Sequence, residues 1–107
     1  MLRNFTGESG ADAAATHSIA VPDGTVSVFF QSLTVSTRGG DIGADVKIAI
    51  TDGGRERWIV YLRSGKVYSG HFDSIGNIQL SNSPSSLGIT TSAGGTGCIV
   101  VVSAVLG

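Results

Sequence analysis

The side chains of this 107-residue chain best suited to nucleophilic or acid–base chemistry are Cys98, His17 and His71. A catalytic nucleophile needs a base beside it and a third group that orients the base. Cys98 begins an apolar run that ends at Val102, where a thiol is typically buried and has a raised pKa. A Cys98–His71 dyad is therefore disfavoured, and we expect no catalytic residue.

A metal site is the second kind of chemistry to consider. His71 and Asp73 stand two residues apart, so both point to one face of a strand, and His17 is the candidate third ligand. A zinc site requires three or four ligands, and nothing in the sequence brings the two histidines together. We therefore expect a surface histidine at position 71, with no metal and no cofactor.

Phosphate and nucleic-acid binding have little support. The glycine clusters at Gly39-Gly40 and at residues 94–97 do not precede a helical pattern, so they read as turns rather than phosphate-binding loops. The formal net charge is −1, with 7 basic and 8 acidic residues. This balance gives no electrostatic reason to expect nucleic acid or an anionic membrane as a partner.

The densest group of basic and aromatic side chains lies between residues 55 and 68. It consists of Arg55, Arg57, Trp58, Tyr61, Arg63, Lys66 and Tyr68. Alternation places Arg57, Tyr61 and Arg63 on one strand face and gives Trp58 the opposite, core-facing parity. Tyr and Arg are enriched at protein interfaces, and aromatic rings also stack on sugars. We expect an interface or a solvated face here, in preference to a ligand site.

Composition indicates the elements that must position these residues. The chain has 16 Gly, and 36 residues are Val, Ile, Thr, Phe, Tyr or Trp, which suit a pleated surface. Only 14% of residues are charged, which is unlike a helical bundle, and 41% are hydrophobic, which is unlike a disordered chain. The length allows one domain. We expect an all-β protein.

Short segments with strand-like patterns recur about every ten residues, separated by turn-forming residues. They cover residues 16–21, 25–35, 46–51, 57–63, 66–72, 75–80, 87–90 and 98–105. This pattern predicts a single antiparallel β-sandwich or jelly roll of about eight strands over residues 15–107. Residues 1–14 show no amphipathic period and are expected to form an N-terminal arm or an irregular lead-in.

Three junctions have distinctive chemistry. The apolar positions of 25–35 change phase at Gln31-Ser32, which predicts a bulge or a bend that could carry the strand from one sheet to the other. Asp52-Gly53-Gly54 predicts a reversal of the chain. Ser64-Gly65 predicts a hairpin between 57–63 and 66–72, and Asp73-Ser74 predicts a further turn.

The last strand is apolar on both faces, from Ile99 to Val102. A β-branched run left exposed invites aggregation, so we expect one face in the core and the other covered by a second subunit or by residues 1–14. Val100 and Val102 are taken as the interface pair, together with Arg57, Tyr61, Arg63 and Tyr68. The single cysteine excludes an intrachain disulfide framework, which favours an intracellular origin or stabilisation by assembly.

The chain resembles the small β-sandwich decoration or cement proteins of tailed bacteriophage capsids. The resemblance spans residues 16–105 and rests on the turn at 21–26, the expected hairpin over 57–72, and the loop at 81–87 followed by the Gly-rich segment and strand at 94–102. It implies a sandwich fold, a location in the virion after assembly in the host cytoplasm, and no enzymatic residues. It also implies a homotrimer that binds the major capsid protein or other virion proteins.

The leading hypothesis is thus a non-enzymatic viral structural protein that stabilises a capsid shell through many contacts repeated by symmetry. A tail or baseplate component is a variant of this hypothesis. The alternative from another class is a lectin-like carbohydrate-binding module that uses Trp58, Tyr61 and Tyr68. An enzyme is the third and weakest hypothesis.

Overall fold

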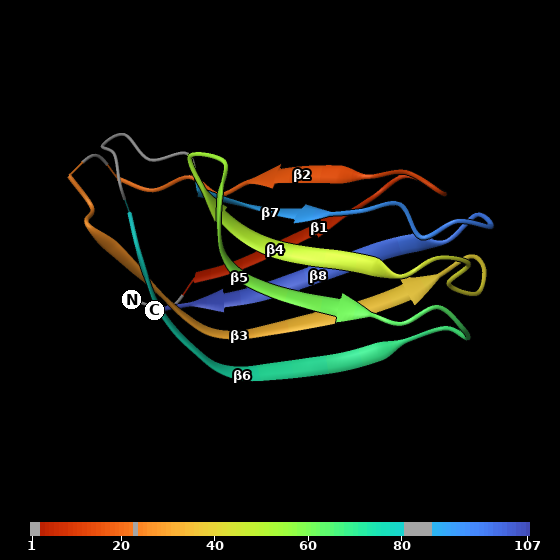
Figure 1. The fold of residues 1–107 in the computed structure, drawn as a ribbon. Helices are drawn as coiled ribbons and strands as arrows, with labels where there is room; N and C mark the ends of the chain where they lie inside the picture. The colour runs from red at the N-terminus through yellow and green to blue at the C-terminus, as the bar shows by residue number, and fades with distance from the viewer. Residues whose placement is uncertain (1–2, 23, 81–86) are drawn as a thin grey trace.

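The computed structural model describes residues 3–22, 24–80 and 87–107, and it is a sandwich of two four-stranded antiparallel sheets (Figure 1). The strands are β1 (Arg3–Glu8), β2 (Ala15–Ser18), β3 (Ser27–Arg38), β4 (Val46–Asp52), β5 (Arg55–Leu62), β6 (Ser69–Gln79), β7 (Leu87–Thr91) and β8 (Ile99–Leu106). One sheet has the order β1-β8-β3-β6 and the other β2-β7-β4-β5. The predicted all-β sandwich of about eight strands is confirmed.

Pairing in this sandwich is nested. β1 pairs with β8, β2 with β7, β3 with β6 and β4 with β5, as in a long hairpin folded over itself. Eight antiparallel strands wound in this way form a jelly roll. The two ends of the chain lie beside each other, because Arg3 is paired with Leu106 (Figure 1).

The core fills the space between the sheets. Inward positions alternate with outward ones along the strands, and Phe30 is the largest of the fully buried side chains. Asp52-Gly53-Gly54 reverses the chain between β4 and β5, as predicted. The phase change in β3 is also confirmed as a register shift between Phe30 and Ser32, but β3 stays within one sheet.

The irregular lead-in expected over residues 1–14 is wrong for Arg3–Glu8, which forms strand β1 beside β8. Phe5 packs against the core while Asn4, Thr6 and Glu8 are exposed, so the segment does have a strand period. Gly7 has no side chain to mark the second inward position. β1 continues the sheet and does not cover the outer face of β8.

The hairpin expected over residues 57–72 is also wrong. β5 belongs to one sheet and β6 to the other, so residues 63–68 form a crossover between the sheets. Asp45 fixes the start of this crossover by accepting hydrogen bonds from Arg63 and from the Ser64 amide. Thr37 pins its end: the Tyr68 amide donates to the Thr37 hydroxyl, and the Thr37 amide donates to the Tyr68 carbonyl.

The turn expected at Asp73-Ser74 is a bulge within one continuous strand. Between the pairs Phe30–Gly76 and Ser32–Asp73, β3 has one residue and β6 has two, and Ser74 takes a positive φ of 57°. The loop expected from residue 81 lies outside the described residues as far as residue 86.

Val100 and Val102 are not interface residues. Both are fully buried in the core, together with Ala104 and Leu106. The outward residues of β8 have the other parity, and Ile99, Val101 and Val105 are half-buried. The two-faced apolar run correctly indicated one buried face, but sequence alone could not say which valines occupy it.

Candidate functional site

The sequence-derived nucleophile and metal groups are not brought together. His17 lies on β2 and His71 on β6, in different sheets, and Cys98 is fully buried at the start of β8. Burial raises the pKa of the Cys98 thiol. Within residues 3–22, 24–80 and 87–107, no three His, Cys, Asp or Glu side chains are grouped so that they could hold a metal ion.

His71 and Asp73 do meet, and Thr34 joins them. His71 Nε2 lies 2.8 Å from Asp73 Oδ1, and His71 Nδ1 lies 2.8 Å from the Thr34 hydroxyl. A hydroxyl, an imidazole and a carboxylate in this order are the parts of an activated nucleophile. The imidazole and carboxylate side chains are 52% and 71% exposed, so water competes for their hydrogen bonds. The hydrogen-bonded series Thr34–His71–Asp73 lies on an exposed sheet face and lacks the desolvation that strengthens a catalytic relay.

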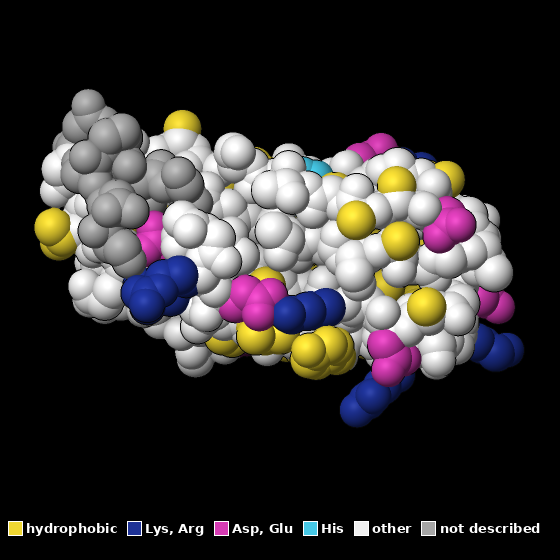
Figure 2. Space-filling view, turned by 45° about the horizontal axis from the view of Figure 1, so that its top comes forward, with side chains coloured by type: hydrophobic (Ala, Val, Ile, Leu, Met, Phe, Trp, Pro, Cys, Tyr) yellow, Lys and Arg dark blue, Asp and Glu magenta, His cyan; other side chains and the backbone are white. Residues whose placement is uncertain are grey.

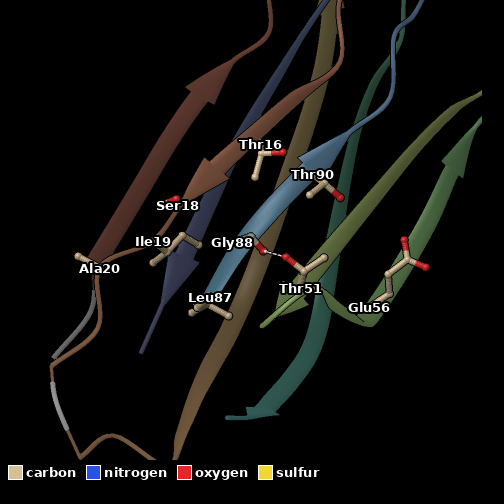
Figure 3. Close-up of a pocket in the computed structure, with 10 residues that line it drawn as sticks. Thr16, Ser18, Ile19, Ala20, Thr51, Glu56, Leu87, Gly88 and Thr90 are labelled. Carbon is tan, nitrogen blue, oxygen red and sulfur yellow. Dashed lines mark hydrogen bonds between the residues drawn. The ribbon is translucent and has the colours of Figure 1, made fainter. Parts of the chain in front are cut away.

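A groove of about 950 Å³ lies on the outer face of β2, β7 and β4. The hydroxyl side chains of Thr16, Ser18, Thr51 and Thr90 line part of it, with Glu56 at its rim (Figure 3). The rest of the lining is Ile19, Ala20, Leu87 and two glycines, Gly54 and Gly88. The Thr51 hydroxyl donates to the Gly88 carbonyl across the floor at 3.5 Å. A Cβ on Gly88 would stand 2.7 Å from the His17 carbonyl oxygen, so close strand packing requires glycine here.

The aromatic side chains of residues 58–68 do not form one platform. Trp58 turns inward and packs edge-on against Phe72, with ring centroids 5.7 Å apart. Tyr68 packs against the core and lies over Gly70, where an added Cβ would collide with its ring. Tyr61 points outward and is 56% exposed. The sequence predicted the opposite parities of Trp58 and Tyr61 correctly.

Two basic members of the group, Arg57 and Arg63, have acidic partners. Arg57 lies 3.6 Å from the buried carboxylate of Asp52, and Arg63 lies 3.1 Å from Asp45. The Ser64 amide and the Arg63 guanidinium together lower the pKa of Asp45. The charges therefore hold the turn and the crossover at the two ends of β5, while apolar side chains occupy the stretch between them.

That apolar stretch is one of two exposed apolar features of the described surface; the other is formed by Val26 and Phe29, at and just before the start of β3. Ile59 and Tyr61 are 42% and 56% exposed on β5, and Val67 is 57% exposed on the crossover. Figure 2 shows apolar side chains beside acidic and basic ones along the lower margin of the molecule, next to a face that is largely white. We call Arg57, Ile59, Tyr61, Arg63 and Val67 the β5 surface. Sequence reasoning named Arg57, Tyr61 and Arg63 as interface candidates and did not name Ile59 or Val67. Alternation along the strand places Ile59 on the same face as Arg57 and Tyr61, so that signal was available, whereas Val67 lies in the crossover and has no such signal.

Comparisons with known proteins add no assignment to this geometry. The chain matches no protein-family model and no curated protein. No helix in the described chain is both long enough and apolar enough to cross a membrane.

Proposed function

We propose that this chain is a non-enzymatic structural protein of a virus particle, a decoration protein that binds the outside of a capsid shell. The β5 surface carries the proposal, because it combines exposed apolar side chains with tyrosine and arginine, the residues that protein interfaces favour. The jelly-roll strand order is compatible with it, since viral capsid domains use this architecture, as lectin domains also do. In this proposal the major capsid protein and further copies of the chain are the partners.

The proposal is tested on particles. Mass spectrometry of gradient-purified particles from a culture that produces this protein is expected to find it in a fixed ratio to the major capsid protein. Particles made without the chain are expected to lose their genome at a lower temperature and to regain resistance when the purified protein is added back. Absence of the protein from purified particles would overturn the proposal.

The hydroxyl-lined groove favours a second candidate function, carbohydrate binding, at a place other than the expected aromatic platform. Hydroxyl groups of Thr16, Ser18 and Thr90 and the carboxylate of Glu56 offer donors and acceptors that match sugar hydroxyls. Glycan-array binding that Thr90→Phe abolishes, and that Thr34→Phe on the other sheet leaves intact, would support this function. A blank array would eliminate it.

A further inference from the structure

β5 has an unpaired edge. In the part of the chain that the structure describes, β5 pairs with β4 and with no other strand. An edge strand presents a row of backbone N–H and C=O groups to any extended segment that approaches it. Charged residues occupy the first positions of β5, whereas Trp58 to Leu62 contains no charge, no proline and no glycine.

The hydrogen-bond pattern shows which backbone groups face outward. The Ser92 amide donates to the Lys47 carbonyl, and the Lys47 amide donates to the Ser92 hydroxyl, so Lys47 faces β7. Backbone groups alternate sides along a strand, so Ile48 faces β5 and bonds its partner Val60. It follows that the backbone groups of Ile59 and Tyr61 point away from β4. These are the same two residues whose side chains are exposed.

The other edge strands are less suited to pairing. β6 is broken by the bulge at Ser74, and bulges of this kind block edge-to-edge association. β2 has only four residues, and its exposed side chains include Thr16 and Ser18. β1 exposes Asn4, Thr6 and Glu8. β5 has a register shift of its own at Arg57, but it is regular from Trp58 to Leu62. Among the described edges, only β5 combines such a regular stretch with outward apolar side chains.

We propose that β5 pairs antiparallel with β5 of a second copy of this chain, about a two-fold axis at Ile59. This inference rests on the proposed function and names one partner of the β5 surface. An axis at Ile59 sets Ile59 opposite its own copy and brings Tyr61 near Arg57, the extra residue at the register shift of β5. An apolar pair is then flanked by two cation–aromatic contacts. An axis at Val60 would instead set Arg57 opposite Arg63, and like charges directly opposite are destabilising.

The geometry also fixes the stoichiometry. A two-fold contact uses the same surface on both copies and closes as a dimer. The inference therefore predicts an even number of copies, whereas the resemblance to decoration proteins implies a trimer.

Variants that each introduce one cysteine test the register of the β5–β5 pairing. The native Cys98 stays in them, but it is buried and does not compete for disulfide formation. Residues directly opposite in an antiparallel pair have Cα atoms about 5.5 Å apart, within reach of a disulfide. Ile59→Cys is expected to form a covalent dimer rapidly under mild oxidation. Tyr61→Cys places the two thiols four residues apart along the strands, roughly 13 Å, and should cross-link slowly. Thr16→Cys on β2 is the matched control for random collision.

Sedimentation of the otherwise unaltered chain supplies a second readout. The parent is expected to be a dimer that Ile59→Lys converts to a folded monomer, while Thr16→Lys remains a dimer. Faster cross-linking at position 61 than at 59, or equal rates at 59 and 16, would overturn the proposed pairing. A monomeric or trimeric parent would also overturn it. None of these results bears on whether the chain is present in purified particles, so the proposed function is tested separately.

Discussion

The sandwich has two lateral edges, one formed by β1 and β2 and the other by β5 and β6. An aromatic pair covers the core at each edge, but the exposed residues of the two edges differ. On one side Phe5 of β1 meets His17 of β2, with ring centroids 6.0 Å apart at 58°. On the other, Trp58 of β5 meets Phe72 of β6 at 5.7 Å and 68°. Each aromatic pair bridges the edge strands of the two sheets, and such pairs stabilise a core beyond the area they bury.

The outer residues of the two sides differ. The β1/β2 side exposes amide, hydroxyl and carboxylate groups, from residues such as Asn4, Glu8 and Thr16. The β5/β6 side exposes Ile59, Tyr61 and Val67. Closure of the core does not require those apolar side chains, because Trp58 and Phe72 provide it. The exposed residues of the β1/β2 side are thus mainly polar, and the β5/β6 side is the one on which we propose the contact.

Truncating the two aromatic closures should have unequal effects. Trp58→Ala is expected to lower the free energy of unfolding by about 3 kcal/mol and Phe5→Ala by about 2 kcal/mol, since the larger ring leaves the larger cavity. Urea denaturation followed by circular dichroism measures both, because Trp58→Ala removes the only tryptophan. If Phe5→Ala lowers the free energy of unfolding more than Trp58→Ala does, the expectation that the larger ring contributes more stability is wrong.

Each side also has a glycine beneath a ring. A Cβ on Gly7 would stand 2.7 Å from His17 Nδ1, and a Cβ on Gly70 would meet the ring of Tyr68. The His17 ring packs against Phe5, whereas the Tyr68 atoms nearest the added Cβ belong to the far end of its side chain. Gly7→Ala is therefore expected to cost about 2 kcal/mol and Gly70→Ala about 1 kcal/mol. Thermal and urea unfolding of the two variants will show whether this order holds.

The two histidines differ in burial, so replacing each by leucine should have unequal effects on stability. His17 Nε2 is buried and has no hydrogen-bond partner among the described residues, so His17→Leu is expected to stabilise the fold by about 1 kcal/mol. His71 is exposed, and His71→Leu should change the stability by less than about 0.5 kcal/mol. Destabilisation by His17→Leu would mean that its contact with Phe5 outweighs the unsatisfied nitrogen.

Acid should loosen the β5/β6 side before the other. The folded pKa of Asp45 lies below its unfolded value, so its stabilising effect is complete above about pH 4 and is lost as the pH falls through the folded pKa. Protonation of Asp45 weakens the hydrogen bonds that it accepts from Arg63 and from the Ser64 amide, so the crossover at residues 63–68 is less firmly attached. Trp58 fluorescence is expected to change at a higher pH than far-ultraviolet circular dichroism. In Asp45→Asn this early fluorescence change should be absent.

Local patterns predicted the local features of this fold. Alternation located most strands, the two glycines located the β4–β5 turn, and the phase change in β3 located its bulge. The failures depended on distant residues. Ser64-Gly65 looks like a hairpin turn locally, but Asp45 and Thr37 direct the chain into the other sheet. Thr34 joins His71 only through the β3–β6 register, which no spacing in the sequence encodes.

Amide hydrogen exchange at low and high protein concentration tests whether the β5/β6 side is the contact side. The Ile19 amide bonds the Leu87 carbonyl, so by alternation the amide of Thr16 faces outward from β2, as those of Ile59 and Tyr61 do from β5. We predict that raising the concentration slows exchange at Ile59 and Tyr61 and leaves Thr16 unchanged. Equal exchange at both concentrations on β5, or slowing at Thr16 alone, would contradict the assignment.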